Sequence, residues 1–251
     1  MRKTIALMTA LASLPLACAD GTNQSKGIEI TGSLNERYAT RYVKGSGKFV
    51  SEGAVVQDTL RLDAETPKLG RFSAWGFMNH DLEAKKGLKG FDSNELVLGT
   101  EHLIPLTEKI SWKNAFMFGS FPDKIIKKDS DYVIDSGLKF KGSLVDLDLA
   151  YRHYLGTQNY KSVDRGSVGI SKRIGLGNFR GWKFSVNPNA RVVYQDNHAG
   201  VKGIHHFTFG ASLGAENRNF GLELFANRQQ GNERLGRKDL TYGGVQVKVK
   251  F

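Results

Sequence analysis

The carboxyl-terminal segment from Leu240 to Phe251 alternates between apolar and polar side chains almost without a break. Successive side chains of a β-strand point to opposite faces, so Val245, Val247 and Val249 share one face with the terminal Phe251. The intervening face carries glycine, glutamine and lysine. One face therefore suits lipid and the other suits water, and the segment predicts a strand that separates the two.

The amino terminus has the pattern of a secretion signal. Two basic residues precede an apolar run, and Ala17, Cys18 and Ala19 form a small-x-small cleavage pattern. The run is shorter than the roughly 20 apolar residues that a membrane-spanning helix needs. We therefore expect residues 1–19 to be a cleaved signal peptide and residues 20–251 to form one domain.

Cys18 is the only cysteine of the chain. Lipidation of this residue is an alternative to cleavage after Ala19, although Pro15 and Leu16 fit a lipoprotein signal poorly. With cleavage after Ala19, the mature chain contains no cysteine and can form neither a disulfide nor a thiolate metal centre.

The net charge is +11 for the whole chain, and loss of Arg2 and Lys3 leaves about +9, which favours anionic partners. Such partners include phosphate-rich lipopolysaccharide and small anionic solutes. The basic residues are spread along the chain, with no zinc-finger spacing, RNA-binding aromatic signature or basic helix. This distribution argues against nucleic-acid binding.

Segments of about ten alternating residues, separated by turn residues, recur through the mature chain, and no helical periodicity is convincing. An even number of strands returns both termini to one side. We predict an all-β fold, a transmembrane antiparallel up-and-down β-barrel of about 12 strands. The expected strands are 28–43, 54–64, 71–80, 94–104, 110–119, 132–141, 144–155, 166–174, 182–195, 204–216, 220–228 and 240–251.

The expected connections alternate in length, as they do between the outer and periplasmic ends of such barrels. The outer, longer connections are residues 44–53, 81–93, 120–131, 156–165, 196–203 and 229–239. The inner connections are residues 65–70, 105–109, 142–143, 175–181 and 217–219.

Segment 182–195 shows the clearest alternation, with an apolar stripe from Trp182 to Tyr194 and aromatic residues at both ends. Pro188 lacks the backbone donor that a central strand uses, which predicts a bulge or a shifted boundary. Aromatic side chains at comparable strand ends predict interfacial girdles. They are Tyr42, Trp112, Tyr132, Tyr151 and Phe220.

Three charged residues, Glu36, Asp58 and Lys172, fall on the expected lipid face. A charge at the bilayer midplane is costly, so either the register slips there or these residues lie near an interface. Segment 71–80 is ambiguous, because Phe72 and Met78 oppose Trp75 and Phe77.

The terminal sequence from Tyr242 to Phe251 resembles the assembly signal of bacterial outer-membrane β-barrels. Within that class the chain is similar to small porins of about 12 strands, such as the acidic-oligosaccharide porins and the TorF-like porins. The resemblance implies location in the outer membrane of a Gram-negative cell, passive solute diffusion and no cofactor. It also implies recognition by the barrel-assembly machinery through Gly244, Val245, Val247, Val249 and Phe251.

Basic residues outnumber acidic ones at the expected inward positions. In a water-filled lumen they would lower the electrostatic barrier for negatively charged solutes, which predicts an anion-preferring channel. The expected pore-lining residues are Arg37, Arg41, Arg61, Lys113, Lys139, Arg152, Lys183 and Arg191. The alternative is that these charges pair across the lumen and close it, because twelve strands lie between filled and open barrels.

An outer-membrane lipid hydrolase would need a histidine beside a serine hydroxyl. None of the six histidines begins a His-x-Ser pattern, and His206 with Thr208 is the nearest imitation. We therefore predict no enzymatic activity. Although His198, His205 and His206 lie close in sequence, adjacent strand residues point to opposite faces, which argues against a metal site. No glycine-rich phosphate loop precedes a helix.

Basic residues in the outer connections predict contact with lipopolysaccharide phosphates, or else solvated loop charge. They are Lys85, Lys86, Lys89, Lys124, Lys127, Lys128, Arg237 and Lys238. Two further alternatives stay open. One is a structural or adhesive barrel without conductance, and the other is a soluble periplasmic β-sandwich, because alternation alone does not distinguish the two folds.

Overall fold

The computed structural model describes residues 28–43, 49–51, 53–67, 69–82, 95–120, 131–155, 163–198, 201–233 and 239–251. The described part of the chain contains fifteen strands. They are β1 (Glu29–Ala39), β2 (Tyr42–Val43), β3 (Phe49–Ser51), β4 (Val55–Thr66), β5 (Gly70–Asp81), β6 (Glu95–Pro105), β7 (Ile110–Ser120), β8 (Asp131–Phe140), β9 (Asp146–Leu155), β10 (Val163–Ser171), β11 (Ile174–Phe179), β12 (Trp182–His198), β13 (Val201–Glu216), β14 (Phe220–Gly231) and β15 (Leu240–Lys250).

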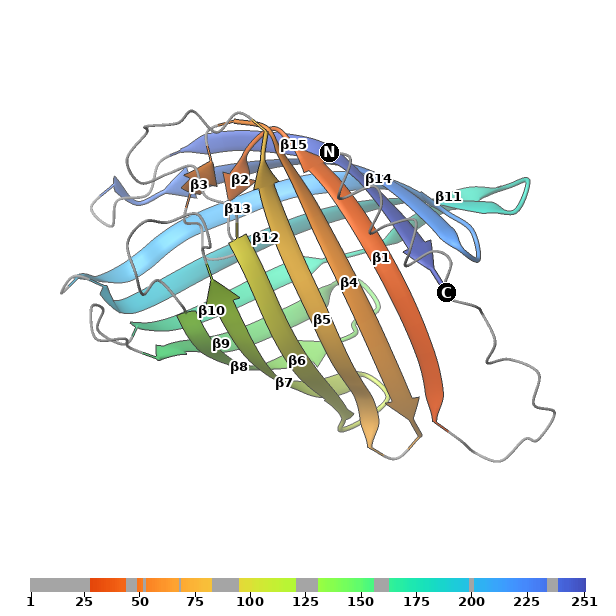
Figure 1. The fold of residues 1–251 in the computed structure, drawn as a ribbon, viewed down its shortest axis with the longest axis horizontal. Coiled ribbons are helices and arrows are strands. Elements are labelled where there is room, and N and C mark those ends of the chain that lie inside the picture. The colour runs from red at the N-terminus through yellow and green to blue at the C-terminus, as the bar shows by residue number, and fades with distance from the viewer. Residues whose placement is uncertain are drawn as a thin grey trace.

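Twelve of these strands form a closed antiparallel barrel (Figure 1). Strand β1 pairs with β4 on one side and with β15 on the other, and β10 pairs with β12 to complete the ring. Strand β11 is an additional strand on β12, while β2 and β3 form a small separate hairpin. The prediction of an up-and-down barrel of about twelve strands is confirmed, and the β-sandwich alternative is wrong.

The two ends of the barrel chain meet at the β1–β15 seam. Gly32 N donates to Phe251 O at 2.7 Å, and Phe251 N donates to Gly32 O at 3.0 Å. The Phe251 ring lies over Gly32, at the place that a Cβ atom of residue 32 would occupy. Glycine here lets the terminal aromatic ring pack against the first strand, so the last residue closes the barrel edge.

The inner face is identified by a cavity that strands from different parts of the ring line together. Arg37 of β1, Asp148 of β9, Arg191 of β12 and Tyr242 of β15 surround one cavity. Strands this far apart in the ring can share a cavity only inside it. Residues at every second position from these four therefore face the lumen.

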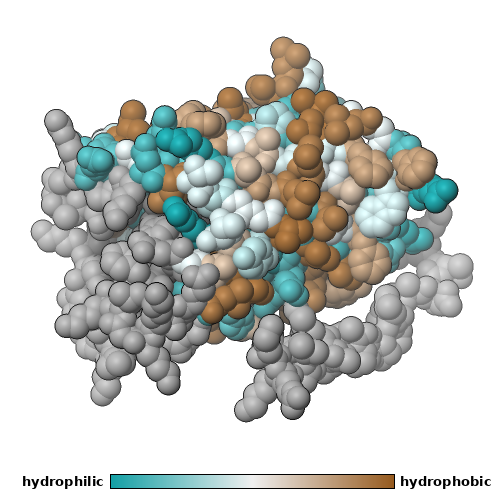
Figure 2. Space-filling model, turned by 90° about the horizontal axis from the view of Figure 1, so that it is seen from above, coloured by the Kyte–Doolittle hydropathy of each residue, from teal (hydrophilic) through white to brown (hydrophobic). Residues whose placement is uncertain are grey.

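The alternate positions form an outer wall rich in exposed apolar side chains. Among them are Leu62, Leu98, Ile134, Leu213, Leu222 and Val247. Figure 2 shows hydrophobic residues gathered mainly along the middle of one side of the barrel, with hydrophilic residues more common toward the ends. This distribution fits a wall that contacts lipid. Within the described residues, no helix has the length and apolarity to cross a membrane.

Connections are short at the end of the barrel where β1 begins and β15 ends. They comprise residues 67–69, 106–109, 141–145, 180–181 and 217–219. At the other end, most connections are longer, as predicted, for example 82–94 and 121–130. The connection expected at 196–203 is a correction, because β12 and β13 extend to His198 and Val201 and leave only residues 199–200 between them.

The expected inner connection 175–181 was also wrong. Residues Ile174–Phe179 form β11, and the turn to β12 consists of Arg180 and Gly181, which have φ values of 48° and 80°. Two successive positive φ values are typical of the two-residue hairpin turn that matches strand twist. The glycines at 175 and 177 flank a register shift within the strand, so here they mark a bulge.

Pro188 occurs within β12, where the neighbouring strand is interrupted. Its carbonyl accepts from Lys172 N at 3.2 Å, in the short break between β10 and β11. The N and O of one residue in an antiparallel strand point toward the same neighbour. The backbone nitrogen of Pro188, which carries no hydrogen, therefore points toward the break between β10 and β11. The hydrogen bonds between β12 and β13 are not affected.

The outer face carries the predicted aromatic residues Trp112, Tyr132, Tyr151 and Phe220, all substantially exposed. The side chain of Tyr42 lies outside the described part of the structure. In β5, Trp75 and Phe77 face inward, because Asn79 on the same face contacts the inward Gln57. The earlier ambiguity of this strand is thus resolved, with Phe72 and Met78 on the outer face.

The three charges expected on the lipid face do not share one environment. Glu36 is exposed on the outer face, whereas Asp58 is buried and its carboxylate lies 3.7 Å from His80 Nε2. Lys172 lies in the break after β10 and donates to the carbonyl of Gly142 at 2.6 Å, at the barrel rim. The register holds, and Lys172 is accommodated by its place at a rim.

Candidate functional site

The lumen contains a polar cavity of about 430 Å³ in which two arginines face the interior. Arg37 projects from β1 and Arg191 from β12, and the remaining wall is mostly amide and hydroxyl groups. These groups come from Asn189, Thr208, Asn227, Gln229 and Tyr242. The combination offers a charge for an anionic group and neutral hydrogen-bonding partners for the rest of a solute.

Arg37 is positioned by an aromatic ring. Its guanidinium carbon lies 3.9 Å from the centroid of Phe225, which belongs to β14. Phe225 packs with Phe77 against the buried pair Ala39 and Val55. A small apolar cluster thus supports the arginine, and a cation–π contact orients it.

A second lumenal cavity of about 430 Å³ lies nearer the end of the barrel where β1 begins and β15 ends. It is lined by three basic residues, Arg173, Lys248 and Lys250, and by two acidic residues, Glu216 and Glu223. Glu216 contacts Arg173 at 3.2 Å and Lys250 at 3.6 Å. Basic groups outnumber acidic ones in this cavity as in the first. We call Arg37, Arg173, Arg191, Lys248 and Lys250 together the basic wall.

The opposite side of the lumen carries basic residues that are closely paired with carboxylates. Arg61 Nε contacts Asp63 at 2.8 Å, and its Nη2 contacts Glu101 at 2.9 Å. Ser73 donates to Asp63 in the same cluster. The side chains of β4, β5 and β6 therefore form one network that neutralises the Arg61 charge locally.

A second network joins β7, β8 and β9. The buried Asp135 carboxylate contacts Lys113 Nζ at 3.2 Å and accepts a hydrogen bond from Arg152 Nε at 3.1 Å. We call Arg61, Asp63, Glu101, Lys113, Asp135 and Arg152 together the paired wall. Its three basic and three acidic groups balance each other.

The remaining predicted pore-lining residues are less central. Lys139 lies on the inner face of β8, in register with Asp148. Lys183 has inward parity but is exposed in the β11–β12 hairpin. Arg41 is exposed in the bend that follows β1 and thus lies outside the barrel strands. Arg191, in contrast, lies in the first cavity, where it contacts Asp148 at 3.7 Å.

At the opposite end of the barrel, where β1 ends and β15 begins, several side chains are almost completely buried. Gln195 and His205 are 0% exposed, and Gln229 and Asn79 are 1% exposed. Gln195 accepts a hydrogen bond from Arg165 at 2.8 Å. These side chains are therefore enclosed by protein, in contrast to the partly exposed residues of the basic wall.

The expectation that His205 and His206 point to opposite faces was wrong. Both are buried, and their Nδ1 atoms lie 2.8 Å apart. The β12–β13 register shifts between Val193 and Tyr194, opposite these histidines, and a bulge removes strict alternation. Within the described ranges, no group of three or more His, Cys, Asp or Glu side chains is placed to hold a metal.

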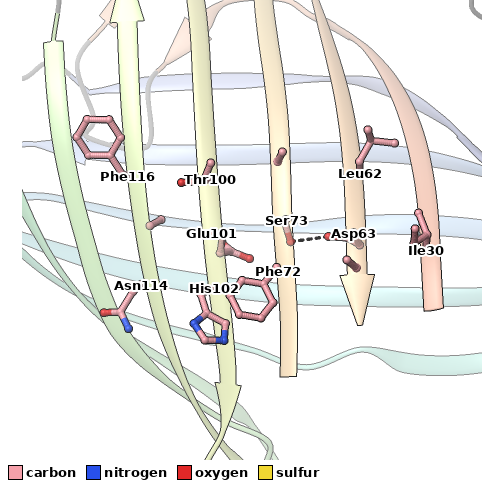
Figure 3. Close-up of a pocket in the computed structure, with 13 residues that line it drawn as sticks. Ile30, Leu62, Asp63, Phe72, Ser73, Thr100, Glu101, His102, Asn114 and Phe116 are labelled. Carbon is pink, nitrogen blue, oxygen red and sulfur yellow. Dashed lines mark hydrogen bonds between the residues drawn. The ribbon is translucent and has the colours of Figure 1, made fainter. Parts of the chain in front are cut away.

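Two further cavities lie on the outer wall and do not belong to the lumen. One, of about 620 Å³, is lined by Ile30, Leu62, Phe72, His102 and Phe116, which belong to β1, β4, β5, β6 and β7 (Figure 3). The His102 ring stacks on Phe72 with centroids 3.8 Å apart. The other, of about 590 Å³, is lined by residues of β7, β8, β9, β10 and β12 that include Trp112 and Tyr151. Both are apolar hollows of the lipid-facing surface.

Histidine contacts in the described strands bear on the hydrolase alternative. His153 Nδ1 lies 2.7 Å from Asp164, which also accepts from the Tyr151 hydroxyl, and this group faces outward. His102 contacts a backbone carbonyl. His206 and Thr208 share the inner cavity, as their spacing predicts. The His153 and His102 contacts involve a carboxylate and a carbonyl, not the serine hydroxyl that a nucleophilic site requires.

The predicted assembly-signal residues all lie in the β15 region of the seam. Val245, Val247 and Val249 face outward with Phe251, and Gly244 faces inward. A Cβ atom at Gly244 would collide with the β1 backbone and the Phe225 ring. Glycine at position 244 therefore permits close packing of β15 against β1 and against Phe225. The recognition of this segment by the assembly machinery stays a prediction.

Several lumenal residues were absent from the predicted set. Arg173 falls in the break after β10, and Tyr242, Asn227 and Gln229 carry no charge. Tyr242 and Asn227 fall in expected strands but carry no charge, and charge was the criterion used to select pore-lining residues. Selecting polar residues of either kind would still have missed Gln229, because it falls in the expected outer connection 229–239, whereas β14 extends to Gly231.

Other predicted residues lie outside the described part of the chain. They are residues 1–19 and the basic residues of the outer connections, Lys85, Lys86, Lys89, Lys124, Lys127, Lys128, Arg237 and Lys238. The signal peptide and the lipopolysaccharide contacts therefore stay predictions.

Comparison with known proteins gives no sequence-level family. No protein-family model matches the chain, and no curated protein matches it. Solved structures match in fold. The KdgM porin has 11% identity and a TM-score of 0.51, covering 87% of this chain and 99% of that chain. The NanC porin has 13% identity and a TM-score of 0.51, covering 87% of this chain and 98% of that chain.

The KdgM porin in complex with disordered oligogalacturonate matches with 12% identity and a TM-score of 0.51. The match covers 87% of this chain and 99% of that chain. The fold is thus that of small outer-membrane porins, the class whose resemblance the terminal sequence indicated.

Proposed function

We propose that this protein is an outer-membrane channel for small solutes and that its lumen prefers anions. The cavity between Arg37 and Arg191 carries the proposal, because inside the barrel it places two guanidinium groups beside a single carboxylate, that of Asp148, and several neutral amide and hydroxyl groups. A channel residue that lowers the barrier for an anion must face the lumen, and the presence of both arginines in this cavity supports that role.

The membrane location is supported by three independent features. The outer wall exposes apolar and aromatic side chains, the inner face is polar, and the amino terminus has a secretion-signal pattern. The barrel fold shared with the KdgM and NanC porins agrees with this location. The outer wall would lose contact with water in lipid, while the lumen would keep it.

The preference for anions follows from the imbalance of charge in the two lumenal cavities. Each has more basic than acidic residues, whereas the charges of the paired wall cancel within contact distance. A net positive lining attracts anions over a Debye length, which is about 10 Å at 0.1 M salt. The basic wall, and not the full set of lumenal arginines and lysines, would then set the selectivity.

The test is the reversal potential of the refolded protein in a planar bilayer with a salt gradient. The double variant Arg37→Gln/Arg191→Gln should shift the reversal potential toward equal permeability for anions and cations. Arg228→Gln is a matched control, because Arg228 lies on the outer face of β14. An unchanged reversal potential in the double variant, with clear conductance, would refute the anion preference.

A non-conducting structural or adhesive barrel is the alternative function. This alternative requires a lumen that is closed to ions. Bilayers that stay silent after verified insertion would support this candidate. The same recordings therefore separate a channel from a closed barrel before selectivity is considered.

A further inference from the structure

The β11–β12 hairpin carries an exposed apolar surface that the channel function does not use. All six residues of β11 are exposed, and the hairpin ends in Phe179, Arg180, Gly181 and Trp182. Figure 1 shows it extending beyond the barrel at the end that holds the carboxyl terminus. The first residue of β9, Asp146, pairs with Ser171, so β9 does not extend alongside β11.

The hairpin is two-faced. Ser185 faces the lumenal cavity, so Trp182, Phe184 and Val186 face outward by alternation. Their partners in β11 continue this surface, because Ile174 pairs with Val186 and Phe179 pairs with Trp182. The inward side instead carries polar residues such as Asn178 and Lys183.

This apolar face is continuous with the lipid-facing wall of the barrel. The pairing register places Phe184 in one row with Ala215 of β13, Leu222 of β14 and Val247 of β15. The outward stripe of β12 from Trp182 to Tyr194 spans about 40 Å along the strand, or about 30 Å along the bilayer normal at a tilt near 40°. That length is enough to reach from one interface to the other.

The edge of β11 restricts the depth at which the hairpin can lie. On the side away from β12, none of the described strands pairs with β11. Unpaired backbone groups are not tolerated in the hydrocarbon core, where water is absent. An exposed apolar face, in turn, disfavours bulk water. Only the interface, where headgroups and water meet acyl chains, satisfies both the face and the edge.

We propose that the β11–β12 hairpin anchors the barrel at the membrane interface, in the phospholipid leaflet on the side where β1 begins and β15 ends. Phe179, Trp182 and Phe184 contact the upper acyl region, and Arg180 lies among the phosphates. Arg180 stacks against Phe179, with its guanidinium carbon 5.3 Å from the ring centroid, so the cation and the aromatic face are held together at the tip. This inference rests on the membrane location proposed above.

The three tryptophans of the chain provide an internal comparison. Trp75 faces the lumen, where its ring lies over Gly99, Trp112 lies exposed on the outer wall, and Trp182 lies in the hairpin. Variants that keep one tryptophan and replace the other two with phenylalanine would be refolded into phosphatidylcholine vesicles. Quenching by brominated acyl chains and by aqueous iodide would then be measured for each.

Trp182 should lose emission to brominated lipid about as strongly as Trp112 does, and it should be quenched by iodide less than an exposed aqueous tryptophan is. The Trp75 variant should be insensitive to brominated lipid. Strong iodide quenching of Trp182 without lipid quenching would place the hairpin in water and overturn the proposal. Resistance to both quenchers would indicate cover by protein, such as a second copy, and would also overturn it.

The Trp112 variant separates this inference from the proposed location. If Trp112 also fails to respond to brominated lipid, the membrane location itself is wrong. If Trp112 responds and Trp182 does not, only the anchor is wrong. Should a tryptophan variant fail to fold, Arg180→Cys labelled with a polarity-sensitive dye gives the same readout, because the mature chain expected after cleavage has no other cysteine. A dye emission typical of bulk water would again refute the anchor.

Discussion

The basic side chains on the two sides of the lumen differ in their contacts and in their exposure. On the paired wall, Arg61, Lys113 and Arg152 each lie within contact distance of a carboxylate. On the basic wall, Arg37 stacks on an aromatic ring, and Arg191 lies 3.7 Å from Asp148 with much of its side chain exposed. Arg173 and Lys250 of the basic wall also contact a carboxylate, that of Glu216, but the basic side chains of this wall that form ion pairs are more exposed than those of the paired wall.

This difference shows that a basic residue facing a barrel lumen is not by itself a selectivity residue. A buried charge with a close partner contributes mainly to stability, and its loss leaves the partner uncompensated. An accessible charge, even in an ion pair, contributes little to stability and much to the local potential. Substitutions on the two walls should therefore separate stability from selectivity.

The largest loss of stability is expected for Asp135→Ala on the paired wall. Asp135 is 2% exposed and is shared by Lys113 and Arg152, so its removal leaves two cations without their common partner. Removing one member of a buried charge network costs about 3–5 kcal/mol. Urea unfolding in lipid vesicles, followed by tryptophan fluorescence, measures this. Asp239→Ala, in an exposed pair with Arg228, is the control, and equal losses would remove the distinction between buried and exposed pairs.

A smaller loss is expected for Glu101→Ala, because Arg61 keeps its contact with Asp63. A hydrogen bond to a charged group contributes about 1.5–3 kcal/mol. The same urea experiment checks this value, with the exposed Glu65→Ala as control, whose effect should stay within about 0.5 kcal/mol. The variant should also raise anion preference slightly, since the Arg61 charge is then less compensated. A shift toward cations would contradict the neutralising role of Glu101.

Much of this architecture follows from local alternation in the sequence. The stripe from Trp182 to Tyr194 predicted which face of β12 meets lipid, and the structure places Asn187, Asn189 and Arg191 in the lumenal cavities on the other face. Strand alternation depends only on backbone geometry, so one segment suffices to reveal it. The closed twelve-stranded barrel is the sum of such segments.

The pairing of charges could not be predicted in the same way. Asp135 meets Arg152 because β8 and β9 pair with Asp135 opposite Arg152, and this register depends on the turn between them. The bulge beside His205 could not be predicted from β13 alone, because a bulge is a difference in residue number between two paired strands. The glycines of β11 had predicted a turn, since glycine is common both in turns and at bulges.

Phe225→Leu should reduce anion preference at a modest cost in stability. The substitution removes the ring beneath the Arg37 guanidinium, a contact that contributes about 0.5–2 kcal/mol. The arginine would then lose its fixed position in the cavity. Phe207→Leu is the matched control, because Phe207 lies on the outer wall. If Phe225→Leu keeps the reversal potential of the unmodified protein while Arg37→Gln changes it, the ring does not position the arginine.

The smallest change in stability is expected for Arg191→Gln, although it should alter selectivity. The ion pair with Asp148 has a distance of 3.7 Å, and the Arg191 side chain is 42% exposed, so its removal should cost less than about 1 kcal/mol. The reversal potential should nevertheless move toward equal permeability, most strongly in dilute salt. Screening shortens the reach of an exposed charge from about 10 Å at 0.1 M to about 3 Å at 1 M. If Arg191→Gln instead destabilised the barrel as much as Asp135→Ala, its charge would belong with the paired wall, and the basic wall would comprise only Arg37, Arg173, Lys248 and Lys250.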